Sequence, residues 1–206
     1  LGDEAFLDLL EQKFDTALGE RAWPEIRLEE PEPGFDTRRF LQFDDGNLRA
    51  ESARSLARLA VREGSPFVAC TYTEPIAYYE YAYDTAVACA ARGVGTVLVT
   101  AGYANDSPIR ELFRVVRAAT IDVKAFDDAY YRAYCGGGLK PVLNTLVAAR
   151  QEGIWLEVSN LVVPGLTDDP GKIRELCRWM RANLGEDVPL HFLRFVPHYR
   201  LENLPP

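Results

Sequence analysis

Residues 96–124, TVLVTAGYANDSPIRELFRVVRAATIDVK, carry the pattern that decides the fold. The apolar run 96–100 predicts a buried strand, and residues 120–124 predict a second one. Between them, Ser107-Pro108 predicts the start of a helix, because proline is favoured at the first helical position. A strand, a helix and a strand in this short space are typical of a right-handed βαβ unit with parallel strands.

The same alternation extends along the chain in both directions. Apolar runs separated by helical patterns predict six strands, at residues 38–43, 67–73, 96–100, 120–124, 154–163 and 189–196. Six strands are too few for a closed eight-unit barrel, and no GxGxxG motif follows an early strand to indicate a dinucleotide-binding sheet. We therefore predict an α/β fold that forms a six-unit, (βα)6 partial barrel.

The N-terminal part of the chain differs from the rest. A short amphipathic helix pattern is followed by RLEEPEPGFDT (27–37), an acidic and proline-rich stretch typical of an irregular connection. We predict that residues 1–47 form an irregular extension that contains the candidate first strand, and that residues 48–206 form the barrel core. The chain begins at Leu1 rather than at a methionine, and we expect it to be a fragment or a trimmed chain.

The composition excludes several function classes. The 23 basic and 31 acidic residues give a net charge of −8, which argues against broad binding to nucleic acid or to an anionic membrane surface. No stretch approaches the roughly 18–20 apolar residues of a membrane helix, and the acidic start is unlike a signal peptide. We expect a soluble, cytoplasmic protein.

The four cysteines lie far apart in the sequence, at Cys70, Cys89, Cys135 and Cys177. No two are close enough for a CxxC-type metal or redox motif. Scattered thiols in an intracellular chain are usually reduced and structural, so no residue is assigned as a metal ligand.

Polar side chains follow the predicted strands where ligands bind in parallel α/β folds, at their carboxyl ends. They come from five strands and include Thr73, Glu74, Thr100, Asp122, Lys124, Ser159, His191, Arg194 and His198. Because the strand interiors are apolar, this pattern predicts one ligand site at the mouth of the barrel.

Seven motifs in register carry a family resemblance. They are TYTEP (71–75), YYEY (78–81), VTAGY (99–103), IDVKAF (121–126), YRAYCGG (131–137), VVPGLTDD (162–169) and LRFVPHYRLENLPP (193–206). Over residues 48–206 the chain resembles the radical S-adenosylmethionine (SAM) proteins, in particular the AmmeMemoRadiSam-system branch, which is similar to pyruvate formate-lyase-activating enzymes. The resemblance implies a six-unit partial barrel and an enzyme that makes a 5′-deoxyadenosyl radical with a 4Fe–4S cluster.

The resemblance also implies roles for single residues. Glu74 matches the carboxylate that holds the SAM amino group, and a carboxylate suits an ammonium. Asp122 and Lys124 match the pair that contacts the ribose and carboxylate region. Val162, Val163 and Pro164 match backbone near the adenine, and His191, Arg194 and His198 line the far side. The implied SAM site comprises Thr73, Glu74, Gly102, Asp122, Lys124, Val163, His191 and Arg194.

Two departures from the family stand out. The family holds its cluster with three cysteines in CxxxCxxC after the first strand, whereas the loop here is DDGNLRA and no cysteine precedes Cys70. Ala101 also replaces the asparagine usual before the glycine of the third-strand motif. Three explanations remain open for the cysteines: a missing segment, a motif upstream of Leu1, or loss of the cluster with retention of the barrel as a scaffold that binds SAM or a partner.

Each candidate residue also has a plain structural interpretation. Glu74 before Pro75 suits a helix cap, and Asp122 and Lys124 face the same side of a strand and suit a mutual ion pair. Each histidine alone is more typical of a structural role. A different enzyme class, a Schiff-base lyase that uses Lys124, is also open, although the neighbouring Asp122 favours the charged amine. For partners we expect SAM and a protein or peptide substrate, without nucleic acid or membrane.

Overall fold

The computed structural model describes residues 52–71 and 73–196. The predicted extension 1–47, with its candidate strand at 38–43, lies outside these residues, as does His198. The division of the chain at residue 47 therefore stays a prediction.

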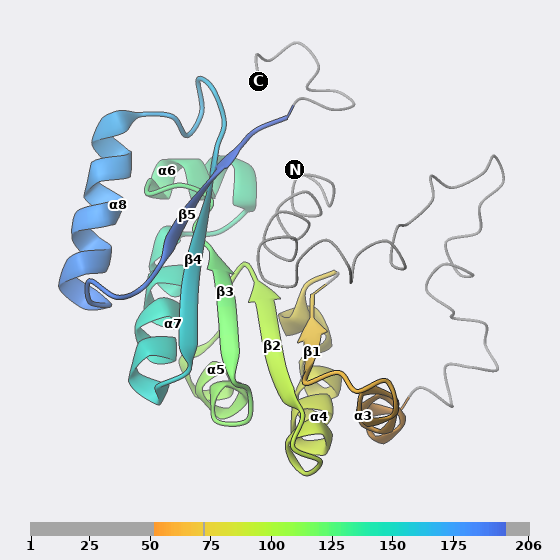
Figure 1. Ribbon diagram of the computed structural model, residues 1–206. Helices are drawn as coiled ribbons and strands as arrows, with labels where there is room; N and C mark the ends of the chain where they lie inside the picture. Colours follow the sequence, from red (N-terminus) through yellow and green to blue (C-terminus); the bar gives the residue numbers. More distant parts are fainter. Residues whose placement is uncertain (1–51, 72, 197–206) are drawn as a thin grey trace, which may run out of the picture. The chain divides into compact units, whose positions relative to one another are not determined.

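The described chain forms one parallel sheet (Figure 1). Its strands follow the chain order, and each pairs in parallel with the next. They are β1 (Phe67–Cys70), β2 (Gly95–Thr100), β3 (Ala118–Asp122), β4 (Trp155–Val162) and β5 (Leu190–Arg194). The structure confirms the α/β class and the parallel succession for five of the six predicted strands, and the sixth lies outside the described residues.

Helices occupy each connection between neighbouring strands, as a series of βα units requires. They are the 3₁₀ helix η1 (Pro75–Tyr78), α4 (Tyr79–Ala90), α5 (Asp106–Phe113), α6 (Asp128–Tyr130), the π-helix η2 (Tyr131–Cys135), α7 (Leu139–Glu152) and α8 (Pro170–Asn183), and a further helix, α3 (Ala53–Arg62), precedes β1. None of these helices is both long and apolar enough to cross a membrane.

Local sequence signals explain most helix ends. The Asp169 carboxylate accepts from the Gly171 backbone N–H and caps α8, whose first residue is a proline. The predicted start of α5 at Ser107-Pro108 is wrong, because the helix begins at Asp106 after an extended Asn105. Proline is tolerated there because the first turn of a helix needs no intrahelical N–H donors.

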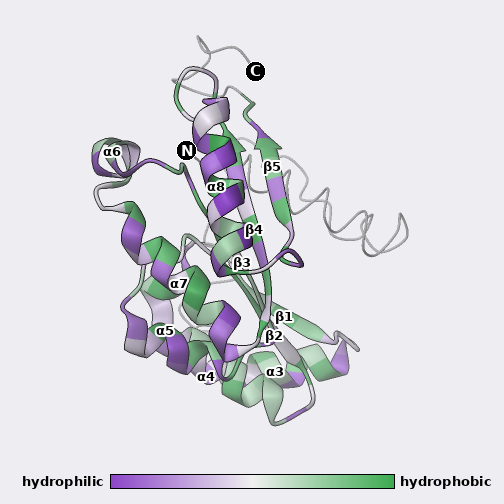
Figure 2. Ribbon diagram, turned by 90° about the vertical axis from the view of Figure 1, so that its left-hand side faces the viewer, coloured by the Kyte–Doolittle hydropathy of each residue, from purple (hydrophilic) through white to green (hydrophobic). Residues whose placement is uncertain are grey.

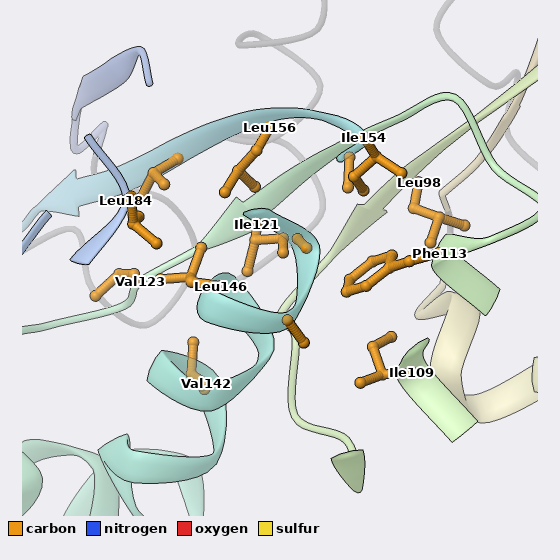
Figure 3. Close-up of a cluster of buried hydrophobic side chains, with 14 of the residues drawn as sticks. Leu98, Ile109, Phe113, Ile121, Val123, Val142, Leu146, Ile154, Leu156 and Leu184 are labelled. Atoms are coloured by element: carbon orange, nitrogen blue, oxygen red, sulfur yellow. The ribbon is translucent and has the colours of Figure 1, made fainter. Parts of the chain in front are cut away.

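The hydrophobic core lies between one face of the sheet and the helices (Figure 3). Strand residues at every second position fill it, together with apolar side chains of α5 and α7: Leu98, Ile121, Leu156, Val158, Ile109, Phe113, Val142 and Leu146. Figure 2 shows that α8 is largely hydrophilic, and only Leu176 and Met180 of this helix are buried. Because side chains alternate along a strand, the intervening residues face away from the helices.

Candidate functional site

Polar residues of three strands form a row on the face of the sheet that the helices do not cover. Asp122 at the end of β3 pairs in register with Ser159 of β4, which pairs with His191 of β5. Residues in register on adjacent strands point to the same face. Asp122 follows Ile121, and the core position of Ile121 turns Asp122 to the opposite side. The sheet thus brings together three side chains that lie far apart in the sequence.

Glu74 lies at the end of β2 although it belongs to the connection after β1. Its Oε1 accepts from Ile76 N at 3.1 Å and from Thr100 Oγ1 at 2.5 Å, and its Oε2 accepts from Ala101 N at 2.8 Å. The first contact caps η1, as the plain interpretation predicted. The other two fix the carboxylate against β2. Since a carboxylate offers about four acceptor positions, one remains for a ligand.

Gly102 allows the sharp turn that follows β2. Its φ is +66°, and its backbone N–H donates to Thr100 Oγ1 at 3.0 Å. A Cβ atom at this position would lie 2.7 Å from Ile121 Cγ2, too close for any side chain. Gly102 therefore lets the backbone that contacts Glu74 pack directly on β3.

Substitution of Gly102 by alanine is expected to lower the free energy of unfolding by about 1–3 kcal/mol, because it adds a clash to an unfavourable backbone conformation. Urea unfolding of the purified chain measures this change. Gly153→Ala is the matched control, since Gly153 has a φ of +75° and a Cβ added there would meet no atom within 4 Å. Equal losses for the two variants would contradict the role of the Ile121 contact.

Asp122 and Lys124 form the ion pair that their spacing predicted. Lys124 Nζ lies 2.8 Å from Asp122 Oδ2, and Ser159 Oγ donates to Asp122 Oδ1. The Asp122 side chain is 14% exposed, whereas that of Lys124 is 40% exposed, so the ammonium stays within reach of a ligand. An ion-paired ammonium is not nucleophilic, which argues against a Schiff-base role for Lys124.

Tyr131 ties the segment after β3 to this site. Its buried hydroxyl accepts from Lys124 N at 3.0 Å, and burial raises the pKa of the Tyr131 hydroxyl well above its ordinary value. The phenol oxygen therefore acts as a neutral acceptor for the Lys124 backbone N–H. Tyr131 begins the π-helix η2, and π-helical turns occur often at functional sites.

Glu157 and Ser159 are site residues that the sequence analysis did not assign to the cofactor. Glu157 Oε2 lies 2.9 Å from His191 Nε2, and Glu157 Oε1 accepts from Trp155 Nε1 at 3.0 Å. The sequence of β4 could have indicated both residues. Side chains alternate along a strand, so Trp155, Glu157 and Ser159 face the side opposite to the buried Leu156 and Val158. His191 is thus held by the carboxylate of Glu157, which shares the face of β4 with Ser159.

The remaining predicted residues are Thr73, Val163 and Arg194. Thr73 is exposed just before Glu74, and the buried Val163 donates its backbone N–H to Thr167 Oγ1 at 2.7 Å. Arg194 is exposed, and its odd spacing from His191 places it on the opposite face of β5. The structure places Glu74 and Gly102 at the end of β2 and Asp122, Lys124 and His191 along the row from β3 to β5, with Arg194 on the opposite face of β5.

The cysteines do not form a group. Cys70 and Cys89 are buried, and Cys135 of η2 and Cys177 of α8 are exposed. Burial raises the pKa of the Cys70 thiol to about 11, which disfavours the thiolate that a metal needs. Among the described residues, no three side chains of histidine, cysteine, aspartate or glutamate are arranged to hold a metal ion.

The sequence matches a family model and two curated proteins. The model is that of the radical SAM superfamily, and it matches residues 37–178. Uncharacterized protein MJ0808 of Methanocaldococcus jannaschii is 38% identical over 163 residues, which are 79% of this chain and 48% of that protein. The pyruvate formate-lyase-activating enzyme of Clostridium pasteurianum is 29% identical over 126 residues, 59% of this chain and 52% of that enzyme. The chain therefore spans about half the length of these relatives.

Solved structures share the fold at low sequence identity. A domain of pyruvate-formate lyase-activating enzyme from Bacteroides vulgatus superposes with a TM-score of 0.52 and 17% identity, over 68% of this chain and 84% of that one. Streptococcus suis SuiB bound to S-adenosylmethionine gives a TM-score of 0.59 and 12% identity, over 76% and 36%. SuiB is also known bound to its precursor peptide SuiA, with a TM-score of 0.56 and 13% identity over 71% and 33%. These likenesses establish the partial-barrel fold.

Proposed function

Because the chain belongs to the radical SAM superfamily, we propose that it is the S-adenosylmethionine-binding core of an enzyme of the activating-enzyme type. The observation that carries the proposal is the Glu74 carboxylate, which Thr100 and Ala101 hold at the end of β2. It keeps one acceptor position at the end of β2, and the next strand, β3, ends in Asp122, the first residue of the polar row. This arrangement suits a small molecule that carries both an ammonium and hydroxyl groups.

The amino group, the carboxylate and the ribose of SAM each have a candidate partner in this chain. Glu74 would accept hydrogen bonds from the amino group, and Lys124 would pair with the carboxylate. Asp122, held by Ser159, would accept from ribose hydroxyls. Backbone at Thr73, Gly102 and Val163 would line the pocket, and His191, held by Glu157, would lie along the row. Arg194 has the weakest support, since it lies on the other face of β5.

The cysteines of this chain do not fit a 4Fe–4S cluster. In this superfamily the cluster, when bound, supplies the electron that cleaves SAM. Three thiolates must converge on it, whereas two of the four thiols here are buried and no three metal-binding side chains of the described residues come together. We therefore assign SAM binding to this chain and no step of the radical reaction. Radical chemistry is proposed only for a complete gene product that supplies these ligands, and a cluster-free SAM-binding scaffold is the second candidate function.

A protein or peptide is the proposed substrate of the complete enzyme. SuiB, which shares the fold, binds a precursor peptide, and pyruvate formate-lyase-activating enzymes take their name from a protein. A partial barrel leaves its mouth accessible to a large partner. The cytoplasmic location expected from the sequence stays a prediction.

Isothermal calorimetry with SAM, together with iron and sulfide assays after anaerobic reconstitution, tests the proposal. We expect this chain to bind SAM and to retain no stoichiometric iron, because its thiols cannot converge. The complete gene product, treated in the same way, separates the two candidates: iron there supports a radical enzyme, and SAM binding without iron supports the scaffold. Absence of SAM binding by both proteins would overturn the proposal.

A further inference from the structure

The peptide group between Val123 and Lys124 is held by two side chains. Its carbonyl accepts from Asn160 Nδ2 at 2.7 Å, and its N–H donates to Tyr131 Oη at 3.0 Å. Asn160 is 3% exposed and Tyr131 is 2% exposed. Both polar atoms of the peptide group therefore have a buried partner, and the group cannot rotate without losing both hydrogen bonds. We call Asn160 and Tyr131 the peptide clamp.

The peptide clamp begins where strand β3 ends. Val123 N still donates to Ser159 O at 2.9 Å, as a residue of the sheet would. β4 continues to Val162, but β3 is paired with it only as far as Asp122. Lys124 comes directly after the clamped carbonyl, and its Nζ lies 2.8 Å from Asp122 Oδ2. The peptide clamp thus fixes the backbone from which the Lys124 ammonium extends.

Asn160 is an unusual residue for a core position. Because side chains alternate along β4, Asn160 follows Leu156 and Val158 on the side of the sheet that faces the helices. Its Oδ1 is buried and has no hydrogen-bond partner among the described residues. An apolar residue would avoid this unfavourable group, and a longer ladder between β3 and β4 would satisfy the peptide group without it. The buried amide therefore indicates a requirement at Lys124 that is separate from the stability of the sheet.

We propose that Asn160 and Tyr131 are positioning residues of the SAM site, which hold Lys124 where its ammonium meets the carboxylate of SAM. This inference rests on the proposed function. Asp122 does not depend on the peptide clamp, because strand register and Ser159 Oγ already hold it. Loss of the peptide clamp is therefore expected to disturb the contact with the SAM carboxylate and to leave the contacts with the amino group and the ribose intact.

Calorimetry on the full chain tests this role with two ligands. Tyr131→Phe removes one oxygen atom and leaves Lys124 N without its acceptor. SAM should bind this variant about three- to tenfold more weakly than it binds the parent chain, which corresponds to the loss of one neutral hydrogen bond. Decarboxylated SAM, which keeps the amino group and lacks the carboxylate, should bind both proteins alike.

Tyr79→Phe is the matched control. It also removes a hydrogen bond between a phenol and the backbone, since Tyr79 Oη donates to Pro108 O at 2.8 Å. This contact joins the connection after β2 to α4 and involves no residue of the proposed site. The Tyr79 variant should therefore bind SAM as the parent chain does.

A double-mutant cycle with Lys124→Met separates positioning from a structural role. If Tyr131 acts through Lys124, Tyr131→Phe weakens SAM binding in the parent chain and has no further effect in the Lys124→Met background. A structural role would give the same loss in both backgrounds. Asn160→Leu keeps the side-chain volume but donates no hydrogen bond, so it should give the same pattern. This second variant keeps the test valid if the Tyr131 variant does not fold.

Amide hydrogen exchange measures the peptide clamp without a ligand. The Lys124 backbone N–H should exchange at least about fivefold faster in Tyr131→Phe than in the parent chain, because its acceptor is gone. Val158 N, which donates to Pro189 O at 2.9 Å within the sheet, should exchange at the same rate in both proteins.

Three results would each overturn the proposal. Unchanged exchange at Lys124 would show that the phenol does not hold the peptide group. Unchanged SAM affinity in Tyr131→Phe, with faster exchange, would show that the peptide clamp does not act on the ligand. Equal losses for SAM and decarboxylated SAM, or equal losses with and without Lys124, would show a structural role. Failure of the proposed function is distinct from these, because the parent chain itself would then not bind SAM.

Discussion

Replacement of Glu74 by glutamine is expected to weaken SAM binding by about 10- to 100-fold, because one charge-assisted hydrogen bond to the amino group is lost. The structure makes this residue sensitive. Three protein donors already occupy the carboxylate and hold it in one orientation, so it needs no rearrangement to receive an ammonium. Calorimetric titration of the variant with SAM measures the change.

The control for Glu74→Gln is a ligand that lacks the amino acid part. 5′-Methylthioadenosine keeps the adenine and ribose, and its affinity should not change in the variant. Because glutamine also places an amide N–H₂ near the Ala101 and Thr100 donors, some loss of stability is expected, and urea unfolding records it. An equal loss of affinity for both ligands would show that the variant disturbs the fold, and unchanged SAM affinity would remove Glu74 from the site.

Much of the fold was predictable because the signals are local. The apolar runs around Leu98, Ile121 and Val158 are buried by helices on one face, and they predicted three central strands. The helix stop at Gly153 was likewise predictable, since a left-handed residue commonly ends a helix. The start of α5 was not predictable in this way, because two residues are each compatible with a helix start. Asn105 is the extended residue before the helix, and Pro108 lies inside its first turn.

The site was predictable only in part, because its contacts join distant segments. The sequence spacing of Asp122 and Lys124 predicted their ion pair, which lies within one short stretch. The contact of Glu74 with Ala101 depends on how the β1 connection folds over β2, and no local pattern reports it. Ser159 reaches Asp122 through strand register alone. Register is set by packing of the whole sheet, so the partner of a strand residue cannot be deduced from its own neighbours.

Replacement of Lys124 by methionine is expected to weaken SAM binding about tenfold or more, with a specific dependence on the ligand. The substitution removes the ammonium proposed to pair with the SAM carboxylate, and it leaves Asp122 as an uncompensated negative charge beside that carboxylate. Decarboxylated SAM, which keeps the amino group, should bind the variant and the parent chain alike. Calorimetry with both ligands measures this difference.

The comparison of SAM with decarboxylated SAM separates two roles of Lys124: pairing with the SAM carboxylate and pairing with Asp122. If Lys124 served only as the ion-pair partner of Asp122, its loss would affect both ligands equally through the position of Asp122, which Ser159 still holds. Glu74→Gln should show the opposite pattern to Lys124→Met, with decarboxylated SAM weakened as much as SAM itself. Titration of the two variants with SAM, decarboxylated SAM and 5′-methylthioadenosine therefore tests both assignments. The SAM amino group is assigned to Glu74 at the end of β2, and the SAM carboxylate is assigned to Lys124 after β3. Equal losses for SAM and decarboxylated SAM in Lys124→Met would contradict the assignment of Lys124 to the carboxylate.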